Sequence, residues 1–185
     1  GPRHDEVSHS RGLLKFVVWL GCLAMLRPVT SMGQERINVW HDSERALERL
    51  ERSAFAYFWD HRDPDTGLIY NTTEPRAPAS PAACGVALCA IPIGIERGWI
   101  RRADGLRRAE HLLRTLHRLP HVNGFFYHFL DPRTGRRVWQ SELSCIDSSL
   151  LFAGAMVSAE YFKGTSVETL ANQLVERARW SWWLD

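Results

Sequence analysis

The spacing of apolar and polar residues predicts that most of the chain is helical. In three segments apolar side chains recur at helical spacing with charged residues between them, which is typical of helices with one exposed face. Two other segments are apolar almost all round and rich in small residues, which indicates buried helices. Ser80–Pro81, Ser144 with Asp147, and Thr165 with Glu168 supply capping signals at three helix starts. The expected helices cover residues 43–60, 81–97, 104–119, 144–162 and 165–178.

Residues 124–140 follow a different period. Aromatic residues alternate along the segment from Phe125 to Leu130, and the turn-forming residues Asp131–Gly135 come next. Val138 and Trp139 follow the turn. Alternation on either side of a turn with Pro and Gly predicts a small β-hairpin.

An internal repeat organises these elements. The sequence Asp-Pro-x-Thr-Gly occurs at Asp63 and again at Asp131, about 68 residues later. Each copy leads to a buried small-residue helix and then to an amphipathic one. A toroid with an inner and an outer ring of helices predicts this alternation better than an ordinary helical bundle does. We therefore expect an all-α fold of helix pairs with a β-hairpin insertion.

The first part of the chain resembles an export signal. Basic residues precede an apolar run over residues 16–26, which is short for a bilayer span but fits the apolar core of a signal peptide. Val29–Ser31 offer a small-residue cleavage site. We expect residues 1–33 to form a tail with a signal peptide, and the mature protein to be periplasmic or extracellular. A retained membrane anchor, lipidation at Cys22 and an ordinary buried segment are the alternatives.

Composition narrows the function mainly by exclusion. A formal net charge of +2 over 185 residues gives no electrostatic argument for a nucleic-acid partner. His111, His117 and His121 lack the spacing of a metal site, because Pro120 breaks the helix between the last two. No metal or other cofactor is expected. The unusual feature is eight Trp residues, several near turns, whose flat faces suit sugar rings or bases.

Candidate chemistry is densest over residues 128–147, where the expected hairpin leads into a buried helix. In a toroid this junction lies at the mouth of the inner ring. Glycoside hydrolysis needs two carboxyl groups flanking the glycosidic bond, and sugars also need aromatic platforms and hydrogen-bond donors. The candidates are Glu142 and Asp147 for catalysis, and His128, Asp131, Arg137 and Trp139 for substrate binding.

Most of these candidates also have a structural interpretation. Asp131 heads a turn, and Asp147 has the spacing of a capping-box partner. Trp139 could belong to the core, and His128 could be a structural histidine in a strand. Glu142 has no evident capping or helical partner, so its functional interpretation is the stronger one.

Long motifs in this chain resemble a known family. They are FAYFW at residues 55–59, IPIGIERGW at 91–99, GFFYHFLD at 124–131, TGRRVWQSELS at 134–144 and IDSSLL at 146–151. In this order they resemble the bacterial glycoamylase-like family, which includes endo-β-1,2-glucanases and related regions of cyclic β-1,2-glucan synthases. The resemblance extends roughly from Ser43 to Asp185.

The resemblance implies an (α/α)6 toroid and an exported, inverting hydrolase of β-1,2-linked glucans that needs no metal. We expect the chain to be a monomer whose partner is a β-glucan. It implies a catalytic or catalysis-supporting role for Glu142 and Asp147. Family catalytic domains are about twice as long as residues 34–185, so we expect an incomplete toroid that is inactive and poorly stable by itself. A non-catalytic glycan-binding module and a structural helical-repeat module are the competing hypotheses.

Overall fold

The computed structural model describes residues 39–183, with side chains from Ser43 onwards, and this part of the chain contains five α-helices and one short 3-10 helix. All five predicted helices are confirmed, although the first begins at Val39 rather than near Ser43. The export-signal prediction lies outside the described residues. The chain divides into two compact units at Leu50 and Glu51, and the unit that starts at Glu51 holds everything described below. The elements are α2 (Val39–Asp60), α3 (Pro81–Glu96), α4 (Arg102–Arg118), α5 (Cys145–Tyr161), α6 (Ser166–Glu176) and η1 (Trp180–Trp183).

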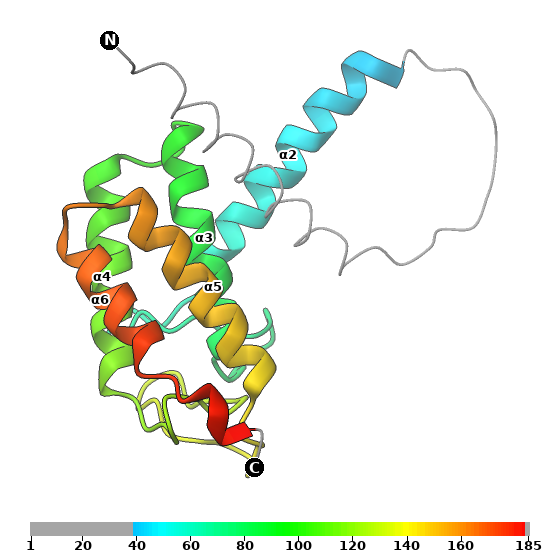
Figure 1. Ribbon diagram of the computed structural model, residues 1–185. Helices are drawn as coiled ribbons and strands as arrows, with labels where there is room; N and C mark the ends of the chain where they lie inside the picture. Colours follow the sequence, from blue (N-terminus) through cyan, green and yellow to red (C-terminus); the bar gives the residue numbers. More distant parts are fainter. Residues whose placement is uncertain (1–38, 184–185) are drawn as a thin grey trace. The chain divides into compact units, whose positions relative to one another are not determined.

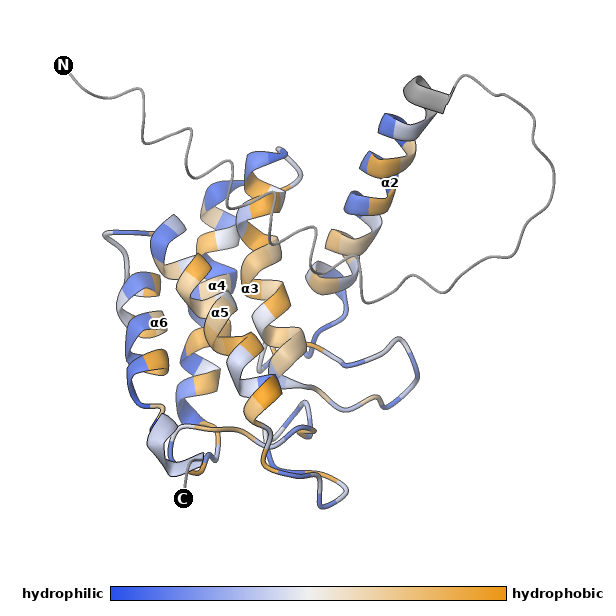
Figure 2. Ribbon diagram, turned by 45° about the vertical axis from the view of Figure 1, so that its right-hand side comes forward, coloured by the Kyte–Doolittle hydropathy of each residue, from blue (hydrophilic) through white to orange (hydrophobic). Residues whose placement is uncertain are grey.

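The helices alternate between an inner and an outer position, as the pattern predicts. The helix α3 packs mainly against α5, while α4 and α6 pack against each other and cover α3 and α5 from one side. Figure 2 shows the reason: α3 and α5 are apolar on most of their surface, whereas α4 and α6 carry polar residues on their outer faces. The helices α3, α4, α5 and α6 run in alternating directions (Figure 1). The starts of α3 and α5 therefore lie at the same end of the helix layer.

Small residues bring the two inner helices into backbone contact. A Cβ atom added at Gly154 would lie 2.0 Å from the Gly85 carbonyl oxygen, a distance that no real side chain tolerates. The Ser158 hydroxyl donates a hydrogen bond of 2.8 Å to the Leu88 carbonyl oxygen across the same interface. The run of Ala, Gly and Ser in α3 and α5 therefore sets how closely these helices approach.

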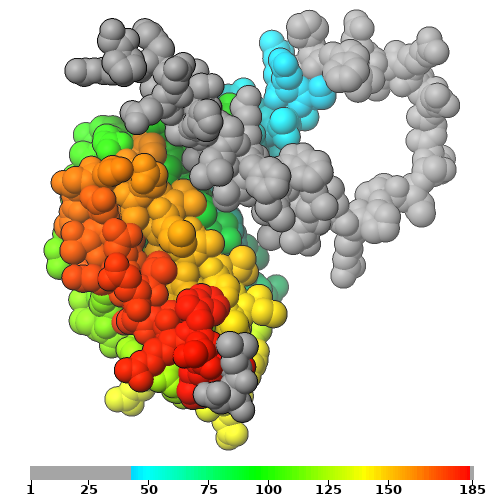
Figure 3. Space-filling model, in the orientation of Figure 1, coloured from blue at the N-terminus to red at the C-terminus, as the bar shows by residue number. Residues whose placement is uncertain are grey.

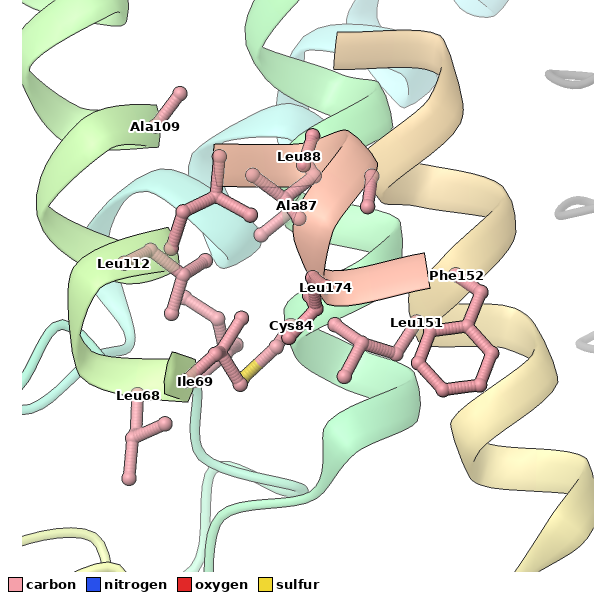
Figure 4. Packing of buried hydrophobic residues seen from close by; sticks show 14 of the residues in the cluster. Leu68, Ile69, Cys84, Ala87, Leu88, Ala109, Leu112, Leu151, Phe152 and Leu174 are labelled. Atoms are coloured by element: carbon pink, nitrogen blue, oxygen red, sulfur yellow. The ribbon is translucent and has the colours of Figure 1, made fainter. Parts of the chain in front are cut away.

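A continuous hydrophobic core fills the space between the helices and the loops below them. Figure 4 shows Cys84 of α3 near the centre of this core, with Ile69 of the first loop and Leu151 of α5 nearby. Leu174 brings α6 into the same cluster. Burial raises the pKa of the Cys84 thiol to about 12, so this cysteine is an uncharged core residue.

The two Asp-Pro-x-Thr-Gly segments fold into the same turn, which confirms the repeat. In each, Oδ1 of the leading aspartate accepts hydrogen bonds from the Thr hydroxyl and from two backbone N–H groups. The glycines that close the turns, Gly67 and Gly135, have φ of 75° and 68°, which favours glycine at both positions. The two turns also touch, because the Thr66 hydroxyl donates a 2.6 Å hydrogen bond to the Pro132 carbonyl oxygen.

The expected β-hairpin forms only as isolated bridges. Within the described residues, Leu130 pairs with Arg137 and Tyr127 pairs with Leu143, both antiparallel, without a continuous ladder. Trp139 and Gln140 adopt φ of 54° and 53° between these pairs. Two consecutive left-handed residues turn the chain out of the extended conformation, which explains why the ladder is interrupted.

One face of α5 is apolar and open to solvent. Ile146, Leu150 and Met156 are 75%, 49% and 58% exposed; Ile146 and Leu150 lie one turn apart, and Met156 follows six residues later on a neighbouring part of the helix surface. Figure 3 shows α5 on the surface of the molecule beside the last helical residues of the chain. We call this set of three side chains the α5 stripe. None of the described helices has the length and apolar character that crossing a membrane requires.

Candidate functional site

The predicted site lies at the shared end where the long loops meet the starts of α3 and α5 (Figure 1). Ser144 caps α5 by accepting a 3.1 Å hydrogen bond from the Asp147 backbone N–H. The Ser144 hydroxyl in turn donates to Oδ2 of Asp147. The cap therefore fixes the Asp147 carboxylate in the first turn of α5, where the helix dipole favours a negative charge.

Backbone pairing holds His128 opposite this cap. The His128 backbone N–H donates to the Glu142 carbonyl oxygen at 2.9 Å, and the Ser144 N–H donates to the Phe126 carbonyl oxygen at 2.9 Å. The buried hydroxyl of Ser148 accepts from the Phe126 N–H at 2.9 Å. The aromatic segment is thus tied to the start of α5 on both sides of His128.

His128 lies between the two candidate catalytic carboxylates. Its Nδ1 is 2.8 Å from Oε1 of Glu142, and its Nε2 is 4.0 Å from Oδ2 of Asp147. The Glu142 side chain is 67% exposed and the Asp147 side chain only 12%, so one carboxylate faces solvent and the other faces the protein. The structure brings together three of the six predicted site residues in this cluster.

The local environment favours a charged Glu142. Its own backbone N–H, and then the hydrogen bond to the His128 imidazole, lower the pKa of Glu142 below its ordinary value. The more distant positive charge of Arg137 acts in the same direction. Glu142 is therefore held as an anion that presents hydrogen-bond acceptors to solvent.

An aromatic surface extends from this cluster. The His128 ring stacks on Phe129 with centroids 3.8 Å apart, and Phe129 meets Trp139 edge to face at 5.4 Å. Trp139 is 72% exposed, so it is not a core residue. Arg137 lies over the Tyr127 ring at 4.7 Å and donates to the Gln140 carbonyl oxygen, next to Trp139.

Asp131 lies apart from the carboxylate pair and organises its own turn. Burial opposes ionisation, but hydrogen bonds from the Thr134 backbone and hydroxyl and from the Arg133 N–H together lower the pKa of Asp131. Asp63, which was not a candidate, accepts the same hydrogen bonds in its own turn. The turn alone therefore explains the bonds to Oδ1 of Asp131. The role of Asp131 as a substrate-binding residue stays a prediction from the sequence, and the structure places it beside an open hollow.

The loop of residues 71–78 borders two open hollows. One, of about 490 Å³, lies between this loop and residues that include His61 and Asp131. The other, of about 330 Å³, lies between the same loop and the aromatic pair Phe129 and Trp139. The loop is polar and contains Pro, which predicts only that it is a loop. Its position across from Trp139 is a tertiary contact that no motif encodes.

The cluster offers acid–base and hydrogen-bonding groups together with an aromatic platform. Among residues 39–183 no group of three or more His, Cys, Asp and Glu side chains could hold a metal ion. The chemistry available from the described side chains is proton transfer between carboxyl and imidazole groups, and binding of a polar ligand with apolar faces.

Comparison with known proteins finds relatives that are named as β-1,2-glucan hydrolases or glucoamylases. No protein-family model matches the sequence. The exo β-1,2-glucooligosaccharide sophorohydrolase (non-reducing end) of Parabacteroides distasonis is 27% identical over 151 residues, which is 76% of this chain and 21% of that enzyme. The chain thus spans about a fifth of the length of this curated relative.

Solved structures have the same helical arrangement. A β-1,2-glucanase from Parabacteroides distasonis matches with a TM-score of 0.70 and 25% identity over 83% of this chain and 23% of its own. An endo-β-1,2-glucanase from Chitinophaga pinensis, solved with sophorotriose and glucose, matches with a TM-score of 0.67 and 25% identity over 76% of this chain and 38% of its own. A glucoamylase-like protein from Bacteroides uniformis, whose function is inferred, shares the fold with a TM-score of 0.70 at 22% identity, over 82% of this chain and 39% of its own.

These matches confirm two predictions. The fold is all-α and is part of an (α/α)6 toroid. The resemblance to glycoamylase-like glycoside hydrolases, carried by the motifs between residues 55 and 151, is also confirmed.

Proposed function

We propose, from this likeness to glycoamylase-like glycoside hydrolases, that the chain binds β-glucan at the cluster of His128, Glu142 and Asp147, with β-1,2-linked glucan as the favoured ligand. The observation that carries the proposal is the pair of carboxylates on one imidazole, at the mouth of the inner helices and beside an exposed Trp. The three named β-1,2-glucan enzymes support the choice of linkage.

The cluster suits a sugar because it combines acceptors with an apolar platform. The charged Glu142 offers oxygens to sugar hydroxyls, and such charge-assisted hydrogen bonds are about twice as strong as neutral ones. Trp139 offers a flat face to the C–H groups of a pyranose ring. Both groups are exposed and are held in place by contacts with their neighbours.

We also propose an inverting two-carboxylate mechanism to which Glu142 and Asp147 contribute one side. In an inverting pair the carboxyl groups lie about 6.5–9.5 Å apart, with the bond and a water between them. Here the His128 imidazole occupies the space between Glu142 and Asp147. The imidazole fills the space that the glycosidic bond and its water would need between these two carboxyl groups, so we expect the described residues to bind glucan without hydrolysing it.

Calorimetric titration with β-1,2-linked gluco-oligosaccharides tests the binding site, with β-1,3- and β-1,4-linked ones to test linkage. Glu142→Gln is expected to weaken binding by about tenfold, the loss of one charge-assisted hydrogen bond. Glu160→Gln is the matched control, because Glu160 is an exposed glutamate at the far end of α5. Equal affinities of the two variants would contradict the proposed site.

Product analysis tests the mechanism. If the chain does release sugar, proton NMR of the first turnovers is expected to show the inverted anomer. Retention of configuration would overturn the inverting proposal, and efficient turnover by this chain would overturn the expectation of binding without hydrolysis.

Export is a separate proposal that rests on the sequence alone. The basic residues and the apolar run over residues 16–26 support a signal peptide. Expression in a bacterial host followed by fractionation and N-terminal sequencing tests it. A chain that stays in the cytoplasm with residues 1–33 intact would contradict it.

A further inference from the structure

We propose that the hollow between the 71–78 loop and Trp139 is a second sugar-binding subsite for the same glucan. This inference rests on the proposed function and adds the location of a subsite and the residues that form it. Within the described residues, one wall is the aromatic pair Phe129 and Trp139, and the other is the loop, with Asn71, Glu74 and Arg76 at its edge. We call this hollow the loop groove.

The polar side chains of the loop groove are available to a ligand. Among the described residues, no hydrogen bond or ion pair engages the side chains of Asn71, Glu74 or Arg76. An amide, a carboxylate and a guanidinium supply both donors and acceptors, which is what vicinal hydroxyls require. Pro75, Pro78 and Phe129 give the groove apolar surface beneath them, as in most small-molecule sites.

Backbone conformation also singles out both walls of the loop groove. Arg76 has φ of 65°, and Trp139 and Gln140 have φ of 54° and 53°. Left-handed backbone is unfavourable for residues with large side chains, and such residues gather at binding and catalytic sites. Two of the four non-glycine residues with positive φ in the described part of the chain, Arg76 and Trp139, line this one groove, and a third, Gln140, follows Trp139 directly.

The repeat explains why two polar loops face each other. Asn71 and Trp139 occupy equivalent positions, each eight residues beyond the leading aspartate of its turn. The two turns are joined by the hydrogen bond from Thr66 to Pro132, and Ala79 pairs with Leu130 between them. The segment that follows the first turn is therefore held beside Leu130 and the second turn, and the groove lies between the 71–78 loop and Trp139.

The groove is continuous with the carboxylate cluster through aromatic rings. Phe129 stacks on His128 at 3.8 Å and supports Trp139 at 5.4 Å. A glucan that contacts Glu142 and continues over Trp139 reaches Arg76 only if it is long enough. The proposal therefore predicts a dependence of affinity on chain length that a single site at Glu142 does not produce.

The test compares sophorose with successively longer β-1,2-linked gluco-oligosaccharides on the full chain. Arg76→Gly removes the guanidinium while glycine suits the local φ, so the fold is expected to persist. It is expected to weaken binding of the long oligosaccharides about tenfold and to leave sophorose binding unchanged. Arg136→Ala is the control, because Arg136 is an exposed arginine that lines neither hollow.

The outcomes separate this inference from the proposed function. Suppose that the wild type binds the oligosaccharides and that Glu142→Gln lowers the affinity. If Arg76→Gly then binds every length of oligosaccharide with the wild-type affinity, the subsite is wrong and the proposed function stands. Equal weakening at every length also overturns the subsite. If wild type binds no oligosaccharide, the proposed function fails and the subsite fails with it. Should Arg76→Gly not fold, Arg76→Asn carries the same test, because Asn tolerates positive φ.

Discussion

Single carboxylates organise the loops of this protein. Asp63 is 5% exposed, and its Oδ1 accepts three hydrogen bonds at 2.9–3.1 Å from the turn that it heads. Asp131 repeats the arrangement at a more exposed position. A buried acceptor with several donors is costly to remove, because the donors lose their partner without regaining water. Asp63 should therefore be the more sensitive of the two positions.

Asp63→Ala is expected to lower the free energy of unfolding by about 1–3 kcal/mol, because the turn loses a buried acceptor and its three hydrogen bonds to partly buried donors. Urea unfolding followed by circular dichroism measures the change. Asp65→Ala is the matched control, since Asp65 is exposed in the same turn and its side chain accepts none of these bonds. If the two variants unfold at the same urea concentration, Asp63 does not hold the turn together.

The contact between His128 and Glu142 predicts a pH dependence. A carboxylate with a lowered pKa in the folded state adds stability above its unfolded pKa, and this contribution is lost as the pH falls through the folded pKa. NMR titration of the Glu142 carboxyl carbon should therefore give a midpoint below the ordinary value of about 4.3. In His128→Ala the midpoint should rise, because the second-largest cause of the shift is removed. A midpoint that stays the same in His128→Ala would show that the imidazole does not act on Glu142.

At the scale of elements, close helix approach is the feature most open to test. Gly154→Ala adds a methyl group where the Gly85 carbonyl oxygen already lies 2.0 Å from the Cβ position. The backbones of α3 and α5 must separate, so we expect a loss of about 2 kcal/mol or more despite the better helix propensity of alanine. Thermal unfolding measures it, and Ala153→Ser on the exposed side of α5 serves as the control. A rise in the melting temperature of Gly154→Ala would contradict the close contact.

The sequence predicted the helices well because their signals are local. Periodicity and the caps at Ser80, Ser144 and Thr165 mark helix starts, and the caps form the expected bonds to backbone N–H groups. The hairpin was predicted less well, because the left-handed turn of the backbone at Trp139 and Gln140 leaves no trace in residue type.

The site followed from the sequence only in part. The sequence predicted Glu142, Asp147 and His128 as candidates. It did not show that they meet, because this depends on pairing of the aromatic segment with the start of α5, and the paired residues are far apart in the sequence. Arg76 was not a candidate, because its role depends on a loop that lies close in space to Trp139 but far away in the sequence. Local patterns cannot reveal contacts of that kind.

At the scale of the whole molecule, the α5 stripe is an exposed apolar surface on a helix that is otherwise packed in the core. Exposed apolar side chains in a row favour association with other apolar surfaces. Ile146, Leu150 and Met156 present such a row on an inner helix of a toroid-type fold. We therefore predict that the stripe promotes self-association at high protein concentration.

Met156→Lys is expected to reduce self-association in sedimentation velocity and to change the free energy of unfolding by less than about 0.5 kcal/mol, because the side chain is exposed. Glu160→Gln changes the net charge by the same amount without removing apolar surface, and should leave self-association as it is. If both variants associate equally, charge rather than the stripe controls association. A large loss of stability in Met156→Lys would show that Met156 is buried in solution.

The hydrogen bond that joins the two repeated turns has a consequence for how the sequence of such a fold can diverge. It consists of one threonine hydroxyl and one backbone carbonyl oxygen, at Thr66 and Pro132. A carbonyl oxygen is present whatever side chain the residue carries, so the joint constrains the sequence at little more than one position. The outer faces of α4 and α6 can then change while the contact between α3 and α5 and the joint at the loops are kept. A ring built in this way can accept new residues at its mouth, and hence new ligands, without rebuilding its frame.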